Sequence, residues 1–376
     1  MEQLGLYIHI PFCIQKCRYC DFPSYAGLED RYLPYVEALC KEIETKGKLA
    51  KEYTVKSIFL GGGTPTVLDA NSLDLILQTI KTSFYIEETA EITIEANPAT
   101  IDAKKLKSLR NSGYNRLSMG MQAWQNRLLQ RLGRIHRIED FVEDFKQARR
   151  AGFQNINADL MFALPEQSFV DWKETVEEVI ALVPEHISAY SLIIEEGTPF
   201  YGEYEAGTLE PMEEELDRQM YEFVVTRLAE AGYHQYEISN FAKMGKESIH
   251  NRIYWERTPY LGMGLGAHSC FGGKRFHQTY DMETYLQAED FLTIEEDAEE
   301  IDTKEAMSEF MFLGLRLTEG IAYERFQEYF GVTLNSVYEV EIQKLVEEGL
   351  LIQDVVGIRL TQRGTDLSNL VFERFV

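Results

Sequence analysis

Six short runs rich in β-branched and aromatic residues, separated by amphipathic segments, constrain the fold of this chain most strongly. The runs are residues 6–10, 55–63, 91–98, 116–122, 155–162 and 186–194. Helical periodicity covers the intervening residues 29–46, 71–83, 102–112, 138–151 and 169–182. Each of these segments is long enough to return the chain to the same edge of one sheet. The alternation therefore predicts an α/β fold, a curved and incompletely closed (β/α)6 barrel with its ligands at the carboxyl ends of the strands.

Three of the five cysteines stand in one loop directly after the first predicted strand. In YIHIPFCIQKCRYCDF, three residues separate Cys13 from Cys17 and two separate Cys17 from Cys20. Thiols this closely spaced are typical of a metal centre and not of a disulfide framework. The loop can hold three irons of a [4Fe–4S] cluster and supplies no thiolate for the fourth. The alternative is a zinc site with His9 or Asp21 as the fourth ligand.

The two remaining cysteines have a simpler interpretation. Cys40 falls within an apolar helical pattern, so we expect a buried thiol. Cys270, in GAHSCFGG, is expected to be packed as well, although its glycine-rich setting leaves open a role near a ligand.

Composition excludes several classes of function. The chain has 376 residues, a formal net charge of −25 and 45% hydrophobic residues. It can bury a large core and is long enough for two domains. Strong acidity argues against nucleic acid as a partner, because affinity for phosphates comes mainly from Lys and Arg. No apolar run is long enough to cross a bilayer and no basic leader precedes the first strand, so we expect a cytoplasmic protein.

The pattern divides the chain into three parts. Residues 1–205 form the predicted barrel with the cysteine loop at 13–20, and residues 206–300 form a connecting region that contains HNRIYW. Residues 301–376 predict helices followed by a two-stranded wing, which indicates a small winged-helix-like domain. This last part has 13 acidic against 7 basic residues. We therefore expect it to pack or to dock a partner and not to bind DNA.

Taken together, the motifs resemble a known family. CxxxCxxC after a first strand, followed by a glycine-rich turn, resembles the radical S-adenosylmethionine (SAM) superfamily. YIHIPFCxxKCxYCDF, GGGTPT, EANP, RLSMGMQ, ADLMFALPEQS and HNRIYW together resemble its haem-chaperone branch, HemW, which is related to HemN, the oxygen-independent coproporphyrinogen III oxidase. The similarity covers nearly the whole chain, including a HemN-like C-terminal domain. It implies three cofactors, a [4Fe–4S] cluster, SAM and haem, and a place in porphyrin metabolism.

A SAM pocket can be assigned residue by residue. A turn without side chains lets the backbone approach the methionyl group closely, and this favours Gly62, Gly63 and Thr64. The resemblance implies further SAM contacts at the strand ends, where carboxylate and amide oxygens suit hydroxyl and ammonium groups and Arg suits a carboxylate. As ordinary structure, the same residues would be turns, helix caps or aromatic core. The residues added by the resemblance are Tyr7, Tyr19, Glu95, Gln122, Arg134 and Asp159.

Two positions separate the related functions. In HemN the cysteine motif resembles CxxxCxxCxC, with a further cysteine two positions after the third. This chain has Phe22 at that last position. Phenylalanine can neither ligate iron nor donate a proton, so coproporphyrinogen III oxidase activity is not expected. Without the resemblance, the polar residues of HNRIYW would be expected to lie on the surface or to cap a helix. The resemblance implies a haem motif in which His250 is the iron ligand, Arg252 approaches a propionate, and Tyr254 and Trp255 form an apolar wall.

The favoured function is a haem chaperone that passes haem to an acceptor protein, and the sequence predicts no catalytic residue. The alternatives are a radical SAM enzyme acting on a tetrapyrrole and a winged-helix regulator with a redox cluster, which the acidic C-terminal domain disfavours. SAM cleavage is compatible with the first two functions. The resemblance implies a haem-acceptor protein and an electron donor such as flavodoxin or ferredoxin as partners. It leaves open a homodimer and peripheral membrane association through the acceptor.

Overall fold

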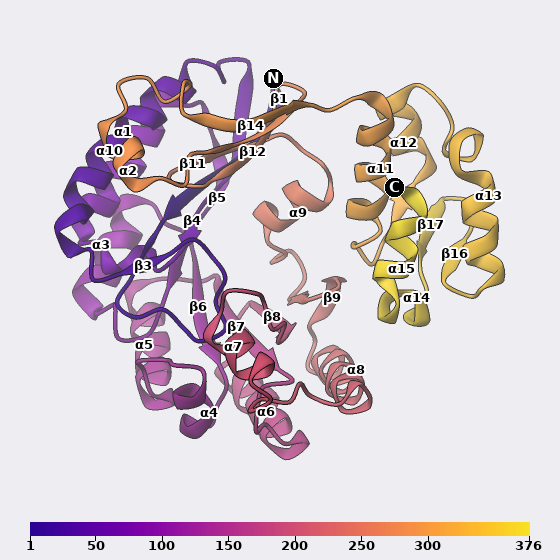
Figure 1. Ribbon diagram of the computed structural model, residues 1–376, viewed down its shortest axis with the longest axis horizontal. Coiled ribbons are helices and arrows are strands. Elements are labelled where there is room, and N and C mark those ends of the chain that lie inside the picture. Colours follow the sequence, from indigo (N-terminus) through magenta and orange to yellow (C-terminus); the bar gives the residue numbers. More distant parts are fainter.

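A computed structural model describes residues 1–376, and a curved parallel sheet forms its centre (Figure 1). Six strands lie side by side in chain order and are all parallel. They are β1 (Glu2–Ile10), β4 (Tyr53–Gly62), β5 (Ile86–Ala96), β6 (Arg116–Gln122), β7 (Ile156–Phe162) and β8 (His186–Ser191). The predicted incomplete (β/α)6 barrel is confirmed.

The helices between these strands cover the outer face of the sheet (Figure 1). Asp69, Asp102 and Ser168 cap three of them by accepting a backbone N–H from the first turn. Leucine and isoleucine on their inner faces join the sheet in one core of 65 buried residues. The helices are α1 (Tyr32–Gly47), α2 (Ala70–Ser83), α3 (Ala103–Ser112), α4 (Asn126–Arg131), α5 (Ile138–Ala151) and α6 (Phe169–Leu182).

Residues 206–300 extend this sheet at both edges. β11 (Tyr260–Met263) pairs in parallel with β1, and β12 (His268–Phe271), β13 (Lys274–Gln278) and β14 (Glu295–Glu300) follow as antiparallel strands. At the opposite edge, β10 (Asn240–Ala242) and β9 (His234–Glu237) continue from β8. The segment predicted as a connecting region thus contributes six strands to a mixed sheet of twelve. It also holds α8 (Glu214–Glu230) and α10 (Met282–Gln287).

A buried ion pair on α1 fixes one of these extensions. Glu42 and Lys46, one turn apart and fully buried, are 3.0 Å apart. Lys46 donates to the carbonyl of Gly262 at 3.1 Å, while Glu42 accepts from the N–H of Gly264 at 2.8 Å and from the Tyr285 hydroxyl at 2.6 Å. Because a buried charge is tolerated only when it is paired and hydrogen-bonded, these contacts specify how the segment after β11 packs against α1.

The short helix α9 (Ile249–Trp255) lies inside the curve of the sheet, between the barrel and the C-terminal domain (Figure 1). Its contacts are with the first halves and the middle of the parallel strands. Ile253 packs against Gly5 of β1, His250 is hydrogen-bonded to Ser57 of β4, and the N–H of His250 donates to Glu91 of β5. Helix α9 therefore closes the amino-terminal end of the barrel.

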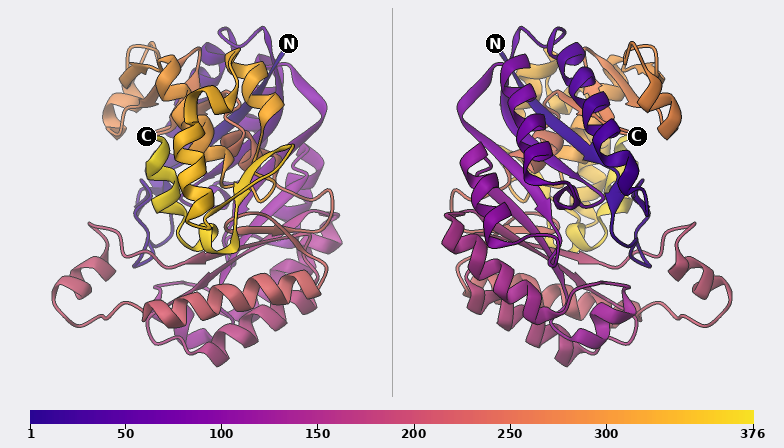
Figure 2. Two further views of the ribbon diagram at one scale, coloured as in Figure 1. Left: turned by 90° about the vertical axis from the view of Figure 1, so that its right-hand side faces the viewer. Right: turned by 90° about the vertical axis from the view of Figure 1, so that its left-hand side faces the viewer.

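The C-terminal domain has a separate core of 13 buried residues and stands beside the open side of the barrel (Figures 1 and 2). The first three of its five helices and a three-stranded antiparallel sheet form the expected winged-helix-like arrangement. No helix anywhere in the chain combines the length and the apolar character needed to span a membrane. The domain comprises α11 (Thr303–Gly314), β15 (Ile321–Ala322), α12 (Tyr323–Phe330), α13 (Leu334–Glu347), β16 (Leu351–Gln353), β17 (Gly357–Leu360), α14 (Gln362–Asp366) and α15 (Ser368–Phe372).

Candidate functional site

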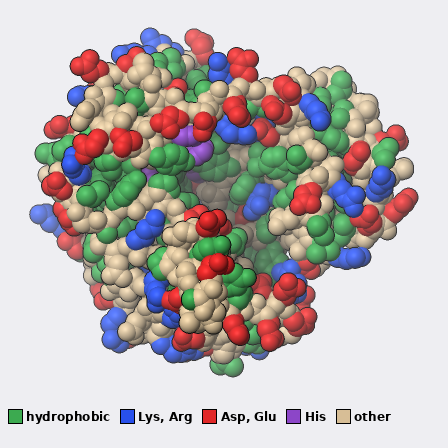
Figure 3. All heavy atoms as spheres, in the orientation of Figure 1, with side chains coloured by type: hydrophobic (Ala, Val, Ile, Leu, Met, Phe, Trp, Pro, Cys, Tyr) green, Lys and Arg blue, Asp and Glu red, His purple; other side chains and the backbone are tan.

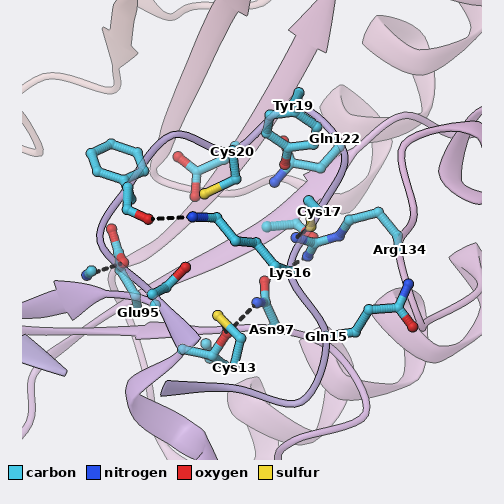
Figure 4. A pocket seen from close by; sticks show the side chains of 18 of the residues that line it. Cys13, Gln15, Lys16, Cys17, Tyr19, Cys20, Glu95, Asn97, Gln122 and Arg134 are labelled. Atoms are coloured by element: carbon cyan, nitrogen blue, oxygen red, sulfur yellow. Dashed lines mark hydrogen bonds between the residues drawn. The ribbon is translucent and has the colours of Figure 1, made fainter. Parts of the chain in front are cut away.

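A cavity of about 440 Å³ lies at the carboxyl ends of the parallel strands. The cysteine loop covers one side of it, and polar side chains from the strand ends form the other (Figure 4). Most of the residues predicted for the cluster and for SAM therefore surround one space. They are Cys13, Cys17, Tyr19, Cys20, Gly62, Gly63, Thr64, Glu95, Gln122, Arg134 and Asp159.

The cysteine loop is tied to the barrel by backbone hydrogen bonds. β2 (Phe12–Cys13) pairs with β3 (Tyr25–Ala26) across the base of the loop. The N–H of Arg18 donates to the carbonyl of Leu132 at 3.0 Å, and the N–H of Thr64 donates to the carbonyl of Phe12 at 2.7 Å. These bonds hold the loop over the strand ends.

The donor set fits a cluster ligated by three thiolates. Cys13, Cys17 and Cys20 are free thiols on the wall of the same cavity. Burial raises the pKa of Cys20 to about 11, so cluster binding releases a proton from this thiol. His9 does not line this cavity. Both of its ring nitrogens are occupied, because Nε2–H donates to the carbonyl of Pro23 at 2.8 Å and Nδ1 accepts from the hydroxyl of Tyr7. The predicted zinc alternative thus lacks His9 as a fourth ligand in this arrangement.

Turn geometry brings the glycine segment against the loop. Gly62 has a φ of 108°, a conformation that glycine adopts without strain. A Cβ on Gly63 would lie 2.6 Å from the carbonyl oxygen of Phe12, so no side chain fits there. The bare backbone of this turn forms part of the cavity wall.

Asn97 joins the cysteine loop to Arg134. Its amide donates to Thr64 Oγ1 at 2.7 Å, and its carbonyl oxygen accepts from Arg134 Nη2 at 2.5 Å. Thr64 Oγ1 lies 3.6 Å from Cys13 Sγ, and Arg134 Nη1 donates to Cys17 Sγ at 3.5 Å. The sequence analysis missed Asn97, although its position in EANP at the end of β5 was the available signal.

Two carboxyl groups face the same cavity. The N–H of Gly62 donates to Glu95 Oε2 at 3.2 Å. Burial, with a contribution from the negative charge of Asp159, raises the pKa of Glu95 to about 8. Burial also raises the pKa of Asp159, against hydrogen bonds from Asn157 and two serines that favour its ionised form. Both groups can accept hydrogen bonds from ligand hydroxyl or ammonium groups.

An arm formed by residues 192–213 projects from the barrel beyond β8 and carries α7 (Pro199–Glu205) (Figure 2). Thr198 caps this helix by accepting from the N–H of Tyr201 at 3.2 Å, and Pro199 occupies the first turn. Ile193, near the start of the arm, is 67% exposed. Leu209, near the end of the arm, is buried in the main core, so the arm is held there and at α7.

Those contacts form a clasp, defined here as Arg18, Arg131, Phe200 and Glu203. Phe200 is fully buried, and its N–H donates to the carbonyl of Arg18 at 3.0 Å. The guanidinium carbons of Arg18 and Arg131 lie 5.7 and 4.8 Å from the Phe200 ring centre. Glu203 pairs with Arg131 at 2.5 Å and also with Arg18. Since Arg18 stands between Cys17 and Cys20, the clasp holds the cysteine loop from outside.

The residues predicted for haem lie apart from the cavity. His250 is 2% exposed and hydrogen-bonded at both ring nitrogens, to Ser57 Oγ at 2.8 Å and to Tyr254 OH at 2.9 Å. Its ring stacks on Phe59 with centres 5.0 Å apart. Burial lowers the pKa of His250 to about 3, so the ring is neutral. Iron ligation by His250 requires that one of its hydrogen bonds be replaced.

The other residues of the motif contact the C-terminal domain or the barrel interior. Arg252 pairs with Glu256 at 2.5 Å and with Glu319 at 2.7 Å, and the guanidinium of Arg316 lies 4.3 Å from the ring centre of Trp255. Motif residues therefore form part of the contact between α9 and the C-terminal domain.

Tyr7, predicted beside SAM, does not line the cavity. Its ring centre lies 6.4 Å from that of His250, and its hydroxyl is hydrogen-bonded to His9 at 2.9 Å. Tyr7 therefore stands between α9 and the base of the cysteine loop.

Comparisons with known proteins find related sequences and a related fold over nearly the whole length of this chain. The family model of the radical SAM superfamily matches residues 7–179, and that of the HemN C-terminal domain matches residues 301–367. The chain is 39% identical to the heme chaperone HemW of Bacillus subtilis over 98% of each chain. It is 36% identical to the heme chaperone HemW of Lactococcus lactis over 98% of this chain and 96% of that one. Coproporphyrinogen III oxidase (HemN) from Escherichia coli, a radical SAM enzyme, has a similar fold. Its TM-score is 0.86 at 23% identity, over 100% of this chain and 90% of that one.

Proposed function

Because the chain belongs to the HemW family within the radical SAM superfamily, we propose that it binds a [4Fe–4S] cluster, SAM and haem and transfers haem to an acceptor protein. The cavity with three thiols on one wall and carboxyl, amide and guanidinium groups on the other carries this proposal. The relatives in this family are named heme chaperones, and this supports haem as the molecule that the chain carries.

In this proposal Cys13, Cys17 and Cys20 hold three irons of the cluster, and the fourth iron is left to the amino and carboxylate groups of SAM. When bound, the cluster supplies the electron that cleaves SAM reductively, and a donor such as flavodoxin or ferredoxin reduces it. Arg134, positioned by Asn97, binds the ligand carboxylate.

The remaining cavity groups bind the nucleoside part of SAM. Glu95 and Asp159 accept hydrogen bonds from ligand hydroxyl and ammonium groups, and Gln122 adds an amide at the end of β6. Tyr19 covers the cluster side of the site. The backbone of Gly63 and its neighbours lies along the methionyl group.

Haem binding in this proposal involves α9. His250 becomes the iron ligand when its hydrogen bond to Tyr254 is replaced, and Arg252 binds a propionate when it leaves Glu319. Tyr254 and Trp255 provide the apolar wall. Figure 3 shows a hollow at the centre of the molecular face, between the barrel and the C-terminal domain, with hydrophobic side chains on its sides. This is the side from which α9 is approached.

Phe22 favours the chaperone over a decarboxylase of porphyrinogens. It lines the cavity and is 59% exposed, and an exposed aromatic ring at this position cannot exchange a proton with a substrate. The rival function, a radical SAM enzyme acting on a tetrapyrrole, needs a group there that phenylalanine does not supply.

Anaerobic reconstitution tests the proposal. Protein holding about four irons is titrated with haem, incubated with a haem-free cytochrome as the acceptor probe, and assayed in parallel with SAM, a reductant and coproporphyrinogen III. We expect a saturable haem spectrum, transfer to the acceptor and no divinyl product. Catalytic formation of protoporphyrinogen would assign the protein to the decarboxylases instead.

A further inference from the structure

Four side chains connect the SAM cavity to α9 inside the barrel, from Asp159 through Asn157 and His186 to Tyr236. Asn157 Nδ2 donates to Asp159 Oδ1 at 2.8 Å, and Asn157 Oδ1 lies 2.7 Å from His186 Nδ1. His186 Nε2 lies 2.9 Å from the hydroxyl of Tyr236. Asn157, His186 and Tyr236 are all buried. The chain of contacts is therefore shielded from water along its length.

The far end of this chain reaches the haem motif. The hydroxyl oxygen of Tyr236 accepts from the backbone N–H of Ser248 and from Asn251 Nδ2, each at 3.4 Å. Ser248 is the N-cap of α9, and Asn251 is the second residue of HNRIYW. One phenol thus contacts both the start of the helix and its first turn.

Hydrogen-bonding rules give every bond in this chain the same direction. The amide nitrogen of Asn157 donates to Asp159 Oδ1, so its amide oxygen faces His186. His186 Nδ1–H must then donate to that oxygen. Burial lowers the pKa of His186 well below its usual value, so the ring is neutral and Nε2 accepts from the Tyr236 hydroxyl. All donors from α9 onward therefore point toward the carboxylate in the cavity.

We propose that this chain of hydrogen bonds makes SAM binding at Asp159 and the seating of α9 interdependent, with Asn157, His186 and Tyr236 as positioning residues. The inference rests on the proposed function, which makes α9 the haem motif. Asp159 already accepts from Asn157 and Ser118, and a SAM hydroxyl or ammonium group that also donates to it weakens the bond from Asn157 at the end of the chain. Helix α9 has seven residues, and helices this short depend on such external contacts. SAM binding therefore loosens α9 and favours haem binding.

Coupling of this kind is reciprocal and is measured as a ratio of affinities. In cluster-loaded protein, we expect saturating SAM to lower the Kd of haem by about fivefold or more, the lower end of typical coupling. Hydrogen exchange in the peptide covering 248–256 should quicken on SAM addition in protein without haem. Tyr236→Phe removes the bond to His186 and weakens the contact with α9. In this variant two ratios should be close to one: the Kd of haem without SAM over that with SAM, and the exchange rate at 248–256 with SAM over that without SAM.

The matched control is Tyr233→Phe. Tyr233 is also buried, and its hydroxyl donates to the carbonyl of Pro184 outside the chain of contacts. This variant should keep the wild-type ratios. If Tyr236→Phe loses iron content, Asn251→Ala removes one contact at the α9 end and should lower the coupling with the barrel interior intact.

The outcomes are distinguishable. If Tyr236→Phe keeps the wild-type ratios, or if exchange at 248–256 is unchanged or slower with SAM, the inference is wrong. Haem that binds equally well with and without SAM also refutes it and leaves the proposed function standing. If the wild type does not bind haem at all, the proposed function fails, and the exchange experiment still decides whether the cavity and α9 are coupled.

Discussion

Removal of the Phe200 ring should release the cysteine loop without unfolding the barrel. The side chain is fully buried in the main core, and two guanidinium groups lie near its ring. Phe→Ala at buried positions costs about 3–5 kcal/mol, and we take the lower end because the clasp lies on a projecting arm. A loss of about 3 kcal/mol from the closed state raises the open fraction of the arm on the order of 100-fold. Because the ring also belongs to the main core of the barrel, part of this cost falls on the barrel itself.

Iron release measures this opening directly. Reconstituted Phe200→Ala should lose iron to an excess of chelator at least about tenfold faster than the wild type, and a protease should cut it sooner within 192–213. The barrel should stay folded, and its melting temperature should fall by only a few degrees, because a large chain loses about 2–4 °C per kcal/mol. Tyr204→Ala is the control, because this side chain lies on the same helix and is 46% exposed. Wild-type iron release from Phe200→Ala, together with faster cleavage of the arm, would show that the clasp holds the arm but not the loop.

Three further predictions follow from other contacts. Cys13→Ala should abolish the cluster and its iron, whereas Cys40→Ala should leave both intact by iron analysis and absorbance. Burial raises the pKa of Asp144 to about 6; a raised native pKa means that stability is lost as pH rises from about 4 through 6. Asp144→Asn should remove this dependence and gain on the order of 1–2 kcal/mol at pH 7 in denaturant titrations; a wild-type pH profile in the variant would contradict the assignment. Glu42→Gln leaves Lys46 buried with Glu295 as its remaining charge partner and should cost about 1.5–3 kcal/mol in the same assay, the range for hydrogen bonds to charged groups; a loss below about 1 kcal/mol would show that the pair is dispensable.

The barrel and most of its cavity could be predicted because they depend on local patterns. The helix expected over residues 29–46 is α1, Tyr32–Gly47, and the segment 169–182 is α6 to the residue. Strand-end polar groups such as Glu95 and Asp159 meet because parallel strands end at one edge of the sheet. Periodicity and topology were therefore sufficient for this part.

These local patterns could not predict which strands pair when they lie far apart in the sequence. β11 joins β1 from far along the chain, and four residues carry too little pattern to identify its partner. HNRIYW has the polar composition of a surface segment, yet His250 is buried because Ser57 and Tyr254 satisfy its nitrogens. The clasp was missed for the same reason, since Arg18 and Arg131 approach Phe200 from two distant segments.

The two ends of the twelve-stranded sheet also bear on how copies of this protein behave when crowded together. An unpaired edge strand is a template for another chain, and a sheet this wide has long edges to protect. β14 is the outermost strand on one side, and five of the six residues in its sequence EEDAEE are acidic. A second copy of that strand would meet it with like charges. On the other side, β9 is covered by the bridge between Glu237 and Leu317 of the C-terminal segment. One edge is thus guarded against aggregation by electrostatic repulsion and the other by a physical cover.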